Sequence, residues 1–272
     1  MTCNYKIVLV LDGGRDSLLV PIIGLNHLSK RVDPDALEKS LFNWLDLIVA
    51  SGDSVLLASI LAQKNSDVLS KTLKLEDFIH YQNQGAESDF ANYFFHADVK
   101  LRDLKTHYNF LSYDIDTDEV FQFSDIIPTQ QGMSVHSMLK ACMSNPAKNQ
   151  FVKLGFRHLI SASEFVPNPI LQASHFTRCL YQENPIVIVS IGSGLHEEND
   201  LEQEFSKNVE ELFKKELTTK RNWHYFRFNP TFEACDSIVM KINKTYRYFE
   251  DQTQQIDRLI RLMDIRKNGV IT

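Results

Sequence analysis

The chain has 272 residues, of which 43% are hydrophobic, and a formal net charge of −6 at pH 7. The charges are spread along the chain without a block of like sign, so we expect no nucleic-acid-binding arm, which needs clustered Lys and Arg to neutralise phosphates. A chain of this length can bury a sizeable core. Because no repeat and no change of composition marks a boundary, we expect a single domain over residues 1–272.

The N-terminus and the cysteines favour a cytoplasmic protein. The first residues, Met1 to Lys6, lack the basic segment and the apolar run of a signal peptide. No apolar run approaches the ~20 residues that span a bilayer, so we expect no transmembrane segment. The four cysteines are isolated, without a Cys-x-x-Cys pair, as in a reduced intracellular protein. No motif for a metal or another cofactor is present, and we expect none.

Strands and helices are predicted to alternate along the chain. Runs of β-branched residues and Leu predict buried parallel strands, and apolar residues at helical spacing predict helices. The predicted strands are residues 6–11, 45–49, 109–113, 120–123, 185–191 and 223–228. The predicted helices are residues 18–28, 33–43, 54–61, 69–81, 135–144, 200–217, 235–243 and 248–263. This alternation predicts a doubly wound α/β sheet.

An acidic turn, Asp114 to Glu119, separates the third and fourth predicted strands, and the three segments together predict a β-hairpin. The Asp-x-Asp-x-Asp spacing of this turn is the kind of pattern that can bind calcium. The Gly and the bidentate Glu that an EF-hand loop needs at later positions are absent. We therefore interpret the segment as a turn.

The strand-turn-helix over residues 45–61 is the centre of the functional prediction. In α/β hydrolases such a unit carries the nucleophilic Ser on a sharp turn between the strand and the helix. Here the tip of the turn is Gly52, which has no side chain that could attack a substrate. We expect the next residue, Asp53, to cap the helix through its carboxylate. Asp12, in the Asp-Gly-Gly turn after the first strand, is expected to stabilise that turn.

Segments of this chain resemble the patatin-like phospholipases, which are lipid acyl hydrolases with a Ser–Asp dyad. Five segments match in the family's order: Asp12–Gly14, Asp46–Ser54, Val166–Pro169, Val189–Gly194 and Tyr225–Pro230. The resemblance runs from Lys6 to about Met263. It implies a patatin-like α/β fold, with a mostly parallel sheet covered by helices on both faces.

The family's first loop, Asp-Gly-Gly-Gly-x-Arg-Gly, supplies backbone N–H groups to the oxyanion hole. Gly13 and Gly14 match this pattern, but Arg15 stands at the third Gly, Ser17 at the Arg and Leu18 at the last Gly. An oxyanion hole stabilises the developing charge by several kcal/mol when its donors approach closely. Side chains at Arg15 and Leu18 are expected to disturb that approach.

The resemblance also implies that both dyad positions are lost. On the family's elbow, the catalytic Ser corresponds to Gly52. Counting back eight residues from Pro169 puts Ser161 at the catalytic Asp and Ala162–Ser163 at the glycines that follow it. Since the Asp activates the Ser by accepting its proton, no catalytic residue is expected in this chain. Ser54 is the best candidate for a displaced nucleophile, but it falls inside the helix.

We therefore expect a non-catalytic relative that acts as a protein-interaction module or as a subunit of a larger assembly, for example a bacterial secretion complex. One alternative is a lipid- or acyl-binding module whose former acyl groove holds a fatty acid without cleaving an ester. Another is an acyl hydrolase that uses Ser54. The groove should be open in the binding module and filled by Arg15, Leu18 or Val55 in the assembly subunit. The acidic net charge argues against binding to an anionic membrane.

Overall fold

A computed structural model describes residues 5–14, 18–32, 43–64, 94–144, 150–196 and 201–268. The predicted helix over residues 69–81 lies outside these ranges, as do Arg15, Ser17 and all of the predicted helix 33–43 except Asn43.

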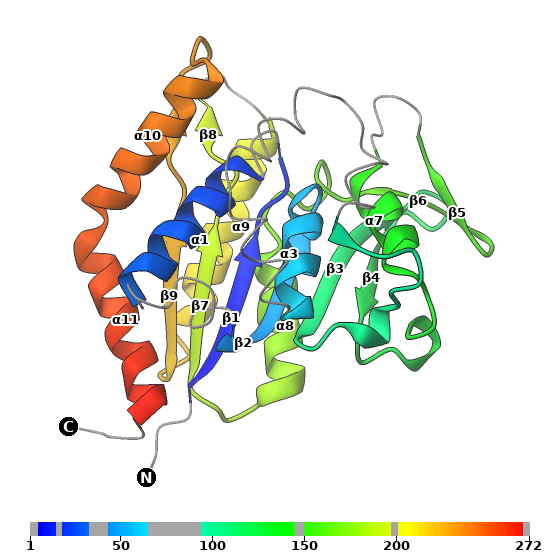
Figure 1. Ribbon diagram of the computed structural model, residues 1–272, viewed down its shortest axis with the longest axis horizontal. Coiled ribbons are helices and arrows are strands. Elements are labelled where there is room, and N and C mark those ends of the chain that lie inside the picture. The colour runs from blue at the N-terminus through cyan, green and yellow to red at the C-terminus, as the bar shows by residue number, and fades with distance from the viewer. Residues whose placement is uncertain are drawn as a thin grey trace.

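One mixed sheet runs through the molecule (Figure 1). Its strands are β1 (Lys6–Leu11), β2 (Leu45–Ser51), β3 (His107–Asp114), β4 (Glu119–Ser124), β5 (Val152–Leu154), β6 (Arg157–Ser161), β7 (Ile186–Ile191) and β9 (Trp223–Phe228). The neighbours β3, β2, β1, β7 and β9 are parallel, whereas β4, β5 and β6 are antiparallel additions at the β3 end. Two short strands, β8 (Leu195–His196) and β10 (Thr231–Phe232), form a separate parallel pair.

Helices cover both faces of this sheet (Figure 1). The described helices are α1 (Leu19–Val32), α3 (Ser54–Gln63), α7 (Val135–Met143), α8 (Ile170–Tyr181), α9 (Leu201–Leu217), α10 (Ile238–Asp251) and α11 (Thr253–Asn268), with two short 3-10 helices at Leu101–Asp103 and Pro128–Gln130. One face packs against α1, α3, α7, α10 and α11, and the other packs against α8 and α9. The predicted fold class, a mostly parallel α/β sheet with helices on both faces, is confirmed.

The β1 run KIVLVL shows why the sequence specifies this layering. Ile7, Leu9 and Leu11 point into the cluster on the α1 face, whereas Val8 and Val10 point into the cluster on the α8 face. All five are buried. Side chains alternate along a strand, so an unbroken apolar run needs an apolar layer on each side. Each such burial contributes roughly 1.5–3 kcal/mol.

The other predicted strands and the β3–β4 hairpin are present, with ends shifted by at most two residues. The predicted break between helices 235–243 and 248–263 is wrong, because α10 is continuous to Asp251. The residues at the expected break contain no helix-breaking Gly or Pro, and Thr245 and Phe249 are both buried on one side of the helix, four positions apart. The hairpin β5–β6 and helix α8 were not predicted.

The pairing of β3 decides how the site is assembled. One side of β3 pairs with β4 over residues 109–114. On its other side, β3 pairs with β2 up to Leu111 and with β6 from Ser112 to Asp114. The end of β2 and the end of β6 therefore meet beside β3. The residues that follow these two strands are brought together in space.

None of the described helices combines the length and apolar composition that crossing a bilayer would require. The cysteines that the structure describes, Cys142, Cys179 and Cys235, are free. Cys142 is buried in α7, and burial raises the pKa of its thiol.

Candidate functional site

The turn between β2 and α3 has the backbone geometry of a tight elbow. Gly52 lies at its tip with a φ of 61°, in the left-handed region that glycine adopts without strain. Its carbonyl accepts a hydrogen bond from the N–H of Val55 in the first turn of α3, at 3.1 Å. The structure thus places Gly52 at the tip of the strand-turn-helix, where the sequence comparison aligned it with the family's nucleophile.

Ser163, which follows β6, packs directly against this tip. A Cβ atom built on Gly52 would lie 2.9 Å from the Cβ of Ser163 and 3.3 Å from the Cα of Gly13. A Cβ atom built on Gly13 would also meet the Cβ of Ser163 at 2.9 Å. Three segments, the β1 turn, the β2 elbow and the end of β6, therefore meet in van der Waals contact with no room for a side chain between them.

The position assigned to the family's Asp lies beside this junction. Ser161 is buried, and its Oγ donates a hydrogen bond to the Oγ of Ser163 at 3.1 Å. The residue that touches Gly52 is therefore Ser163, two positions after Ser161. Ser163 reaches Gly52 because β6 replaces β2 as the strand that pairs with β3. The spacing of residues in the sequence alone does not predict this contact. Neither residue carries a carboxylate that could accept a proton.

Ser51, the last residue of β2, has Val49 and Asp53 where the family's nucleophile has flanking glycines, so the sequence did not predict it as a nucleophile. Its hydroxyl is buried and has no hydrogen-bond partner among the described residues. Its Oγ lies 3.3 Å from a Cβ built on Gly13, so it borders the same junction. Ser51, Ser161 and Ser163 thus supply hydroxyl groups here, and their hydrogen bonds to other described residues include no general base.

The Asp12–Gly14 turn, which the resemblance aligned with the family's oxyanion hole, is engaged in structural contacts. The Gly13 N–H donates to the carbonyl of Pro167 at 2.9 Å. Gly14 has a φ of 124°, and a Cβ built on it would lie 2.6 Å from the Oγ of Ser193. Leu18 is buried just before α1. A donor that already binds a carbonyl cannot be aimed at an oxyanion without rearrangement of the loop.

Ser54, the alternative nucleophile, is fully buried at the start of α3. Its Oγ donates to the carbonyl oxygen of Asp12 at 2.5 Å, so this hydroxyl ties the elbow helix to the β1 turn. The expected capping by Asp53 is wrong. Asp53 occupies the N-cap position but makes no side-chain cap hydrogen bond, because its backbone is already helical instead of extended as in most N-caps.

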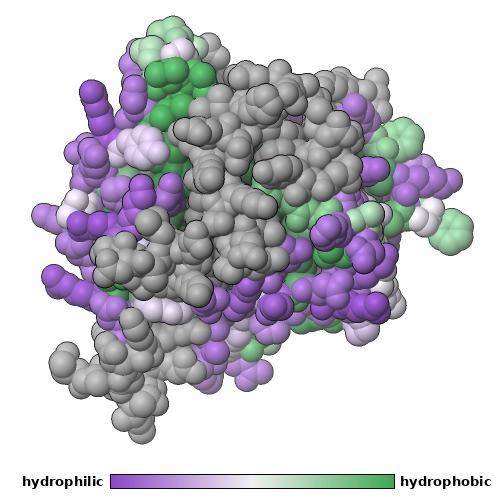
Figure 2. Space-filling view, viewed as in Figure 1, coloured by the Kyte–Doolittle hydropathy of each residue, from purple (hydrophilic) through white to green (hydrophobic). Residues whose placement is uncertain are grey.

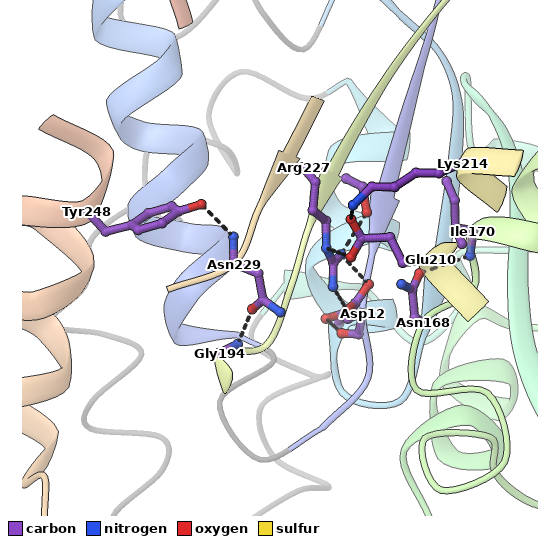
Figure 3. A network of polar contacts seen from close by, with 11 residues as sticks. Asp12, Asn168, Ile170, Gly194, Glu210, Lys214, Arg227, Asn229 and Tyr248 are labelled. Carbon is purple, nitrogen blue, oxygen red and sulfur yellow. Dashed lines mark hydrogen bonds and ion pairs between the residues drawn. The ribbon is translucent and has the colours of Figure 1, made fainter. Parts of the chain in front are cut away.

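Asp12 takes part in a buried ionic network (Figure 3). Arg227 of β9 donates two hydrogen bonds to its carboxylate, at 2.9 and 2.5 Å, and a third to the Oγ of Ser190 in β7, at 2.8 Å. Glu210 of α9 approaches the same guanidinium at 3.6 Å. The expected local role of Asp12 in its own turn is therefore replaced by a link between β1 and β9, two strands separated by β7.

Burial and charge act against each other in this network. Burial raises the pKa of the Asp12 carboxyl, although the Arg227 guanidinium acts to lower it. Burial also acts to lower the pKa of Arg227, but the Asp12 carboxylate outweighs this effect and raises the value. Because the two groups meet in a bidentate geometry, we describe them as an ion pair. Such a pair holds the Asp12 carboxylate away from base catalysis.

A small cavity lies at the carboxyl ends of β1, β7 and β9, with a volume of about 30 Å³. Its lining includes Gly14, Gly194 and Asn229, and Gln203 of α9. The Asn229 side chain accepts the Gly194 N–H at 2.8 Å, and the hydroxyl of Tyr248 accepts the Asn229 N–H at 3.1 Å (Figure 3). A space of this size holds about one or two water molecules and is far smaller than the ~300 Å³ of an ordinary ligand pocket.

Protein groups contact the carboxylates of the acidic turn between β3 and β4. Asp114 pairs with Arg157, and Asp116 pairs with His158 at 2.9 Å. The hydroxyl of Tyr113 donates to Asp118. Among the described residues, no group of His, Cys, Asp and Glu side chains has the arrangement of a metal site.

No protein-family model matches this chain, and no curated protein sequence matches it. Among solved structures, the chain is similar to the crystal structure of VipD from Legionella pneumophila. The two are 10% identical in sequence, and the match covers 94% of this chain and 67% of that chain with a TM-score of 0.49. This weak likeness assigns neither a family nor an activity to the chain.

Proposed function

We propose that this chain is a non-catalytic, patatin-like α/β protein that works by binding another protein, either as an interaction module or as a subunit of a larger assembly such as a bacterial secretion complex. The observation that carries the proposal is the junction of Gly52, Gly13 and Ser163. A side chain on Gly52 would collide with Ser163, and within the part of the chain that the structure describes no carboxylate hydrogen-bonds to Ser161 or Ser163. Among the described residues, the elbow is thus present without a hydroxyl and a carboxylate placed to react, which supports the proposal.

Three neighbouring contacts support the same proposal. The Gly13 N–H is bound to Pro167, the Ser54 hydroxyl is bound to the Asp12 carbonyl, and the Asp12 carboxylate is bound to Arg227. The donor, the hydroxyl and the carboxylate named here are thus used to hold segments of the fold together. Fold and function are separable, so a scaffold can persist after its chemistry is gone.

The acyl-binding alternative would need an apolar groove beside Gly52. The cavity described next to the β1 turn has a volume of about 30 Å³ and is bordered by polar side chains such as Asn229 and Gln203. An acyl chain needs a larger and more apolar space. This cavity therefore does not supply such a groove, and Gly52 is not among its lining residues, so the test that follows separates protein binding from lipid binding.

The first test is affinity purification of the tagged chain from the cells that make it, followed by mass spectrometry of protein and lipid. A protein partner at a stoichiometric ratio, without lipid, is the expected result. A fatty acid or phospholipid without a protein partner would instead establish the acyl-binding function.

A second test addresses hydrolysis through Ser54. The variants Ser54→Ala and Ser59→Ala each remove one buried hydroxyl that donates to a backbone carbonyl, so Ser59→Ala is a matched control. We expect wild type and both variants to hydrolyse a p-nitrophenyl ester at the background rate. A rate above background that disappears only in Ser54→Ala would show that the protein is an enzyme.

A further inference from the structure

The sheet face that α8 covers continues past α8 towards β4, β3, β6 and β5. The helix itself packs on β1 and β2. Beyond it, Tyr113 of β3 pairs with Ile160 of β6, and His158 of β6 pairs with Lys153 of β5. Directly paired side chains share a face, and so do side chains two positions apart in a strand. Phe151, just before β5, therefore belongs to the same face.

Apolar side chains are exposed on this part of the sheet. We call Tyr113, Ile115, Phe151 and Phe165 the aromatic face. Ile115 is 46% exposed, Phe151 54% and Phe165 39%. The rings of Tyr113 and Phe165 are stacked at 3.7 Å between centroids, and the ring of Phe151 meets that of His158 edge-on at 5.0 Å.

The hairpin β5–β6 adds an apolar tip next to the aromatic face. Phe156 is fully exposed in its turn, where Gly155 has a φ of 62°. Figure 1 shows this hairpin projecting at the edge of the molecule. In Figure 2, apolar atoms reach the surface at that edge, with hydrophilic atoms beside them.

These side chains are held in place by contacts within the fold. The stack of Phe165 on Tyr113, and the hydrogen bond from the Tyr113 hydroxyl to Asp118, fix two aromatic rings at the surface. Clustered exposed apolar side chains on a soluble domain mark an interaction surface, since single ones are ordinary but contiguous ones favour association. Aromatic side chains are also enriched in the centres of protein interfaces.

The charges around the aromatic face identify the kind of partner. Asp116, Asp118 and Glu164 are exposed carboxylates on its borders. Of the exposed basic residues beside it, Lys153 lies on β5, and Arg157 of β6 is paired with Asp114. An acidic border attracts basic groups and repels acidic ones. Anionic lipid headgroups would be repelled. A second copy of this chain would bring the same carboxylates against each other.

We propose that the aromatic face and Phe156 bind a segment of another protein in which apolar side chains are flanked by Lys or Arg. This inference rests on the proposed function, because it names the surface and the partner chemistry through which a non-catalytic module would act. The site is distinct from the Gly52 junction and uses none of its residues.

The partner chemistry can be tested with two synthetic amphipathic peptides that share one apolar pattern and carry either Lys or Glu at the polar positions. We expect the Lys peptide to bind at least ~tenfold more tightly than the Glu peptide in fluorescence anisotropy, with affinity that falls as salt rises. Equal binding of both peptides, tighter binding of the Glu peptide, or no binding of the Lys peptide would overturn the proposal.

The surface can be tested with matched variants. Phe151→Ser combined with Phe165→Ser should weaken binding of the Lys peptide ~tenfold or more. Leu212→Ser combined with Val239→Ser, which removes exposed apolar side chains from α9 and α10, should leave it unchanged. Glu164→Lys should likewise weaken binding of the Lys peptide. Glu211→Lys, at an exposed position of α9, should not. Losses of equal size in the control variants would show that the peptide binds elsewhere.

The same variants separate this inference from the proposed function. If wild type captures a stoichiometric protein partner, the Phe151 and Phe165 variant should lose it and the Leu212 and Val239 variant should keep it. If both variants retain the protein partner, the aromatic face is not its binding surface, and the proposed function still stands. Capture of no protein by wild type would contradict the proposed function itself. Binding to vesicles of anionic phospholipid, or dimerisation abolished by Phe156→Ser, would replace the proposed partner with a membrane or a second copy.

Discussion

At the scale of single residues, Gly52 combines two constraints that both exclude a side chain. Its φ of 61° is a conformation that costs other residues of the order of 1–3 kcal/mol, and its missing Cβ leaves the space that Ser163 uses. A Ser at this position would need both a tolerant backbone and an empty space beside it. The contact with Ser163 leaves no space for a side chain at this elbow.

Gly52→Ala is therefore expected to lower the free energy of unfolding by about 1–3 kcal/mol, measured by urea denaturation. The smaller unfolded-state entropy of Ala offsets less than ~1 kcal/mol of this. Ester hydrolysis should stay at background. In a Ser163→Gly background the contact at 2.9 Å is relieved, so the same substitution should cost less. An activity that wild type has and Gly52→Ala loses would contradict the non-catalytic function.

A second prediction at this scale concerns the ion pair of Asp12 and Arg227. Arg227→Met leaves the Asp12 carboxylate buried without its cation, and removal of one partner of a buried pair costs about 3–5 kcal/mol. The double variant Asp12→Asn with Arg227→Met removes both charges and should be more stable than Arg227→Met alone. Urea denaturation of the four proteins in this cycle measures the coupling. Additive losses would show that the two groups do not act as a pair.

At the scale of elements, the predictions from sequence agreed best with the structure for strands whose own residues are mostly apolar. The predominantly apolar runs of β1, β2 and β7 indicated buried strands, and all three are central in the sheet. Strand β5 has three residues, too few for a hydrophobic period. Helix α8 begins after Pro169 without a side-chain cap, and its polar and apolar residues are mixed. Their places depend on the sheet they pack on.

The β3–β4 hairpin carries a pH-dependent contact at its open end. The His107 imidazole and the Asp125 carboxylate lie 2.5 Å apart, and Asp125 also accepts the Tyr108 N–H at 3.2 Å. The hydrogen bond to Asp125 raises the pKa of His107 above its usual value, although partial burial opposes the rise. The protonated imidazole therefore stabilises the folded state.

This contribution is fully present below the unfolded pKa of about 6.5 and is lost as pH rises through the folded value. We expect His107→Gln to destabilise the protein more at about pH 6 than at about pH 8.5. The difference should be below about 1 kcal/mol, because the pair is half-exposed. His175→Gln, which removes an exposed imidazole from α8, is the control for urea denaturation at both pH values. A destabilisation by His107→Gln that is equal at the two pH values would contradict the linkage.

At the scale of the whole molecule, one sheet connects the N-terminal, central and C-terminal segments. The larger apolar cluster joins side chains of β1, α1, α3 and α7 to those of α10 and α11. A single domain over residues 1–272, expected from the length and composition, stays a prediction that unfolding can test.

A single domain should unfold in one cooperative transition. The two tryptophans, Trp44 beside β2 and Trp223 at the start of β9, report on different strands of the sheet. We expect Trp44→Phe and Trp223→Phe to give fluorescence midpoints in urea that coincide with the midpoint of each variant's far-ultraviolet circular dichroism. Midpoints that separate in either variant would indicate two units that unfold independently.

The sequence by itself determined the layered α/β architecture and the absence of a side chain at Gly52, because both are written in local residue types. Apolar runs fix which strands must be buried, and a glycine cannot supply a nucleophile wherever it lies. Only the tertiary structure placed Ser163 against Gly52, gave Asp12 its partner Arg227 and left Phe151 and Phe165 at the surface. The two contacts join residues that are far apart in the chain, and the exposure of Phe151 and Phe165 depends on which surfaces the fold leaves uncovered. Neither can be predicted from a local sequence pattern.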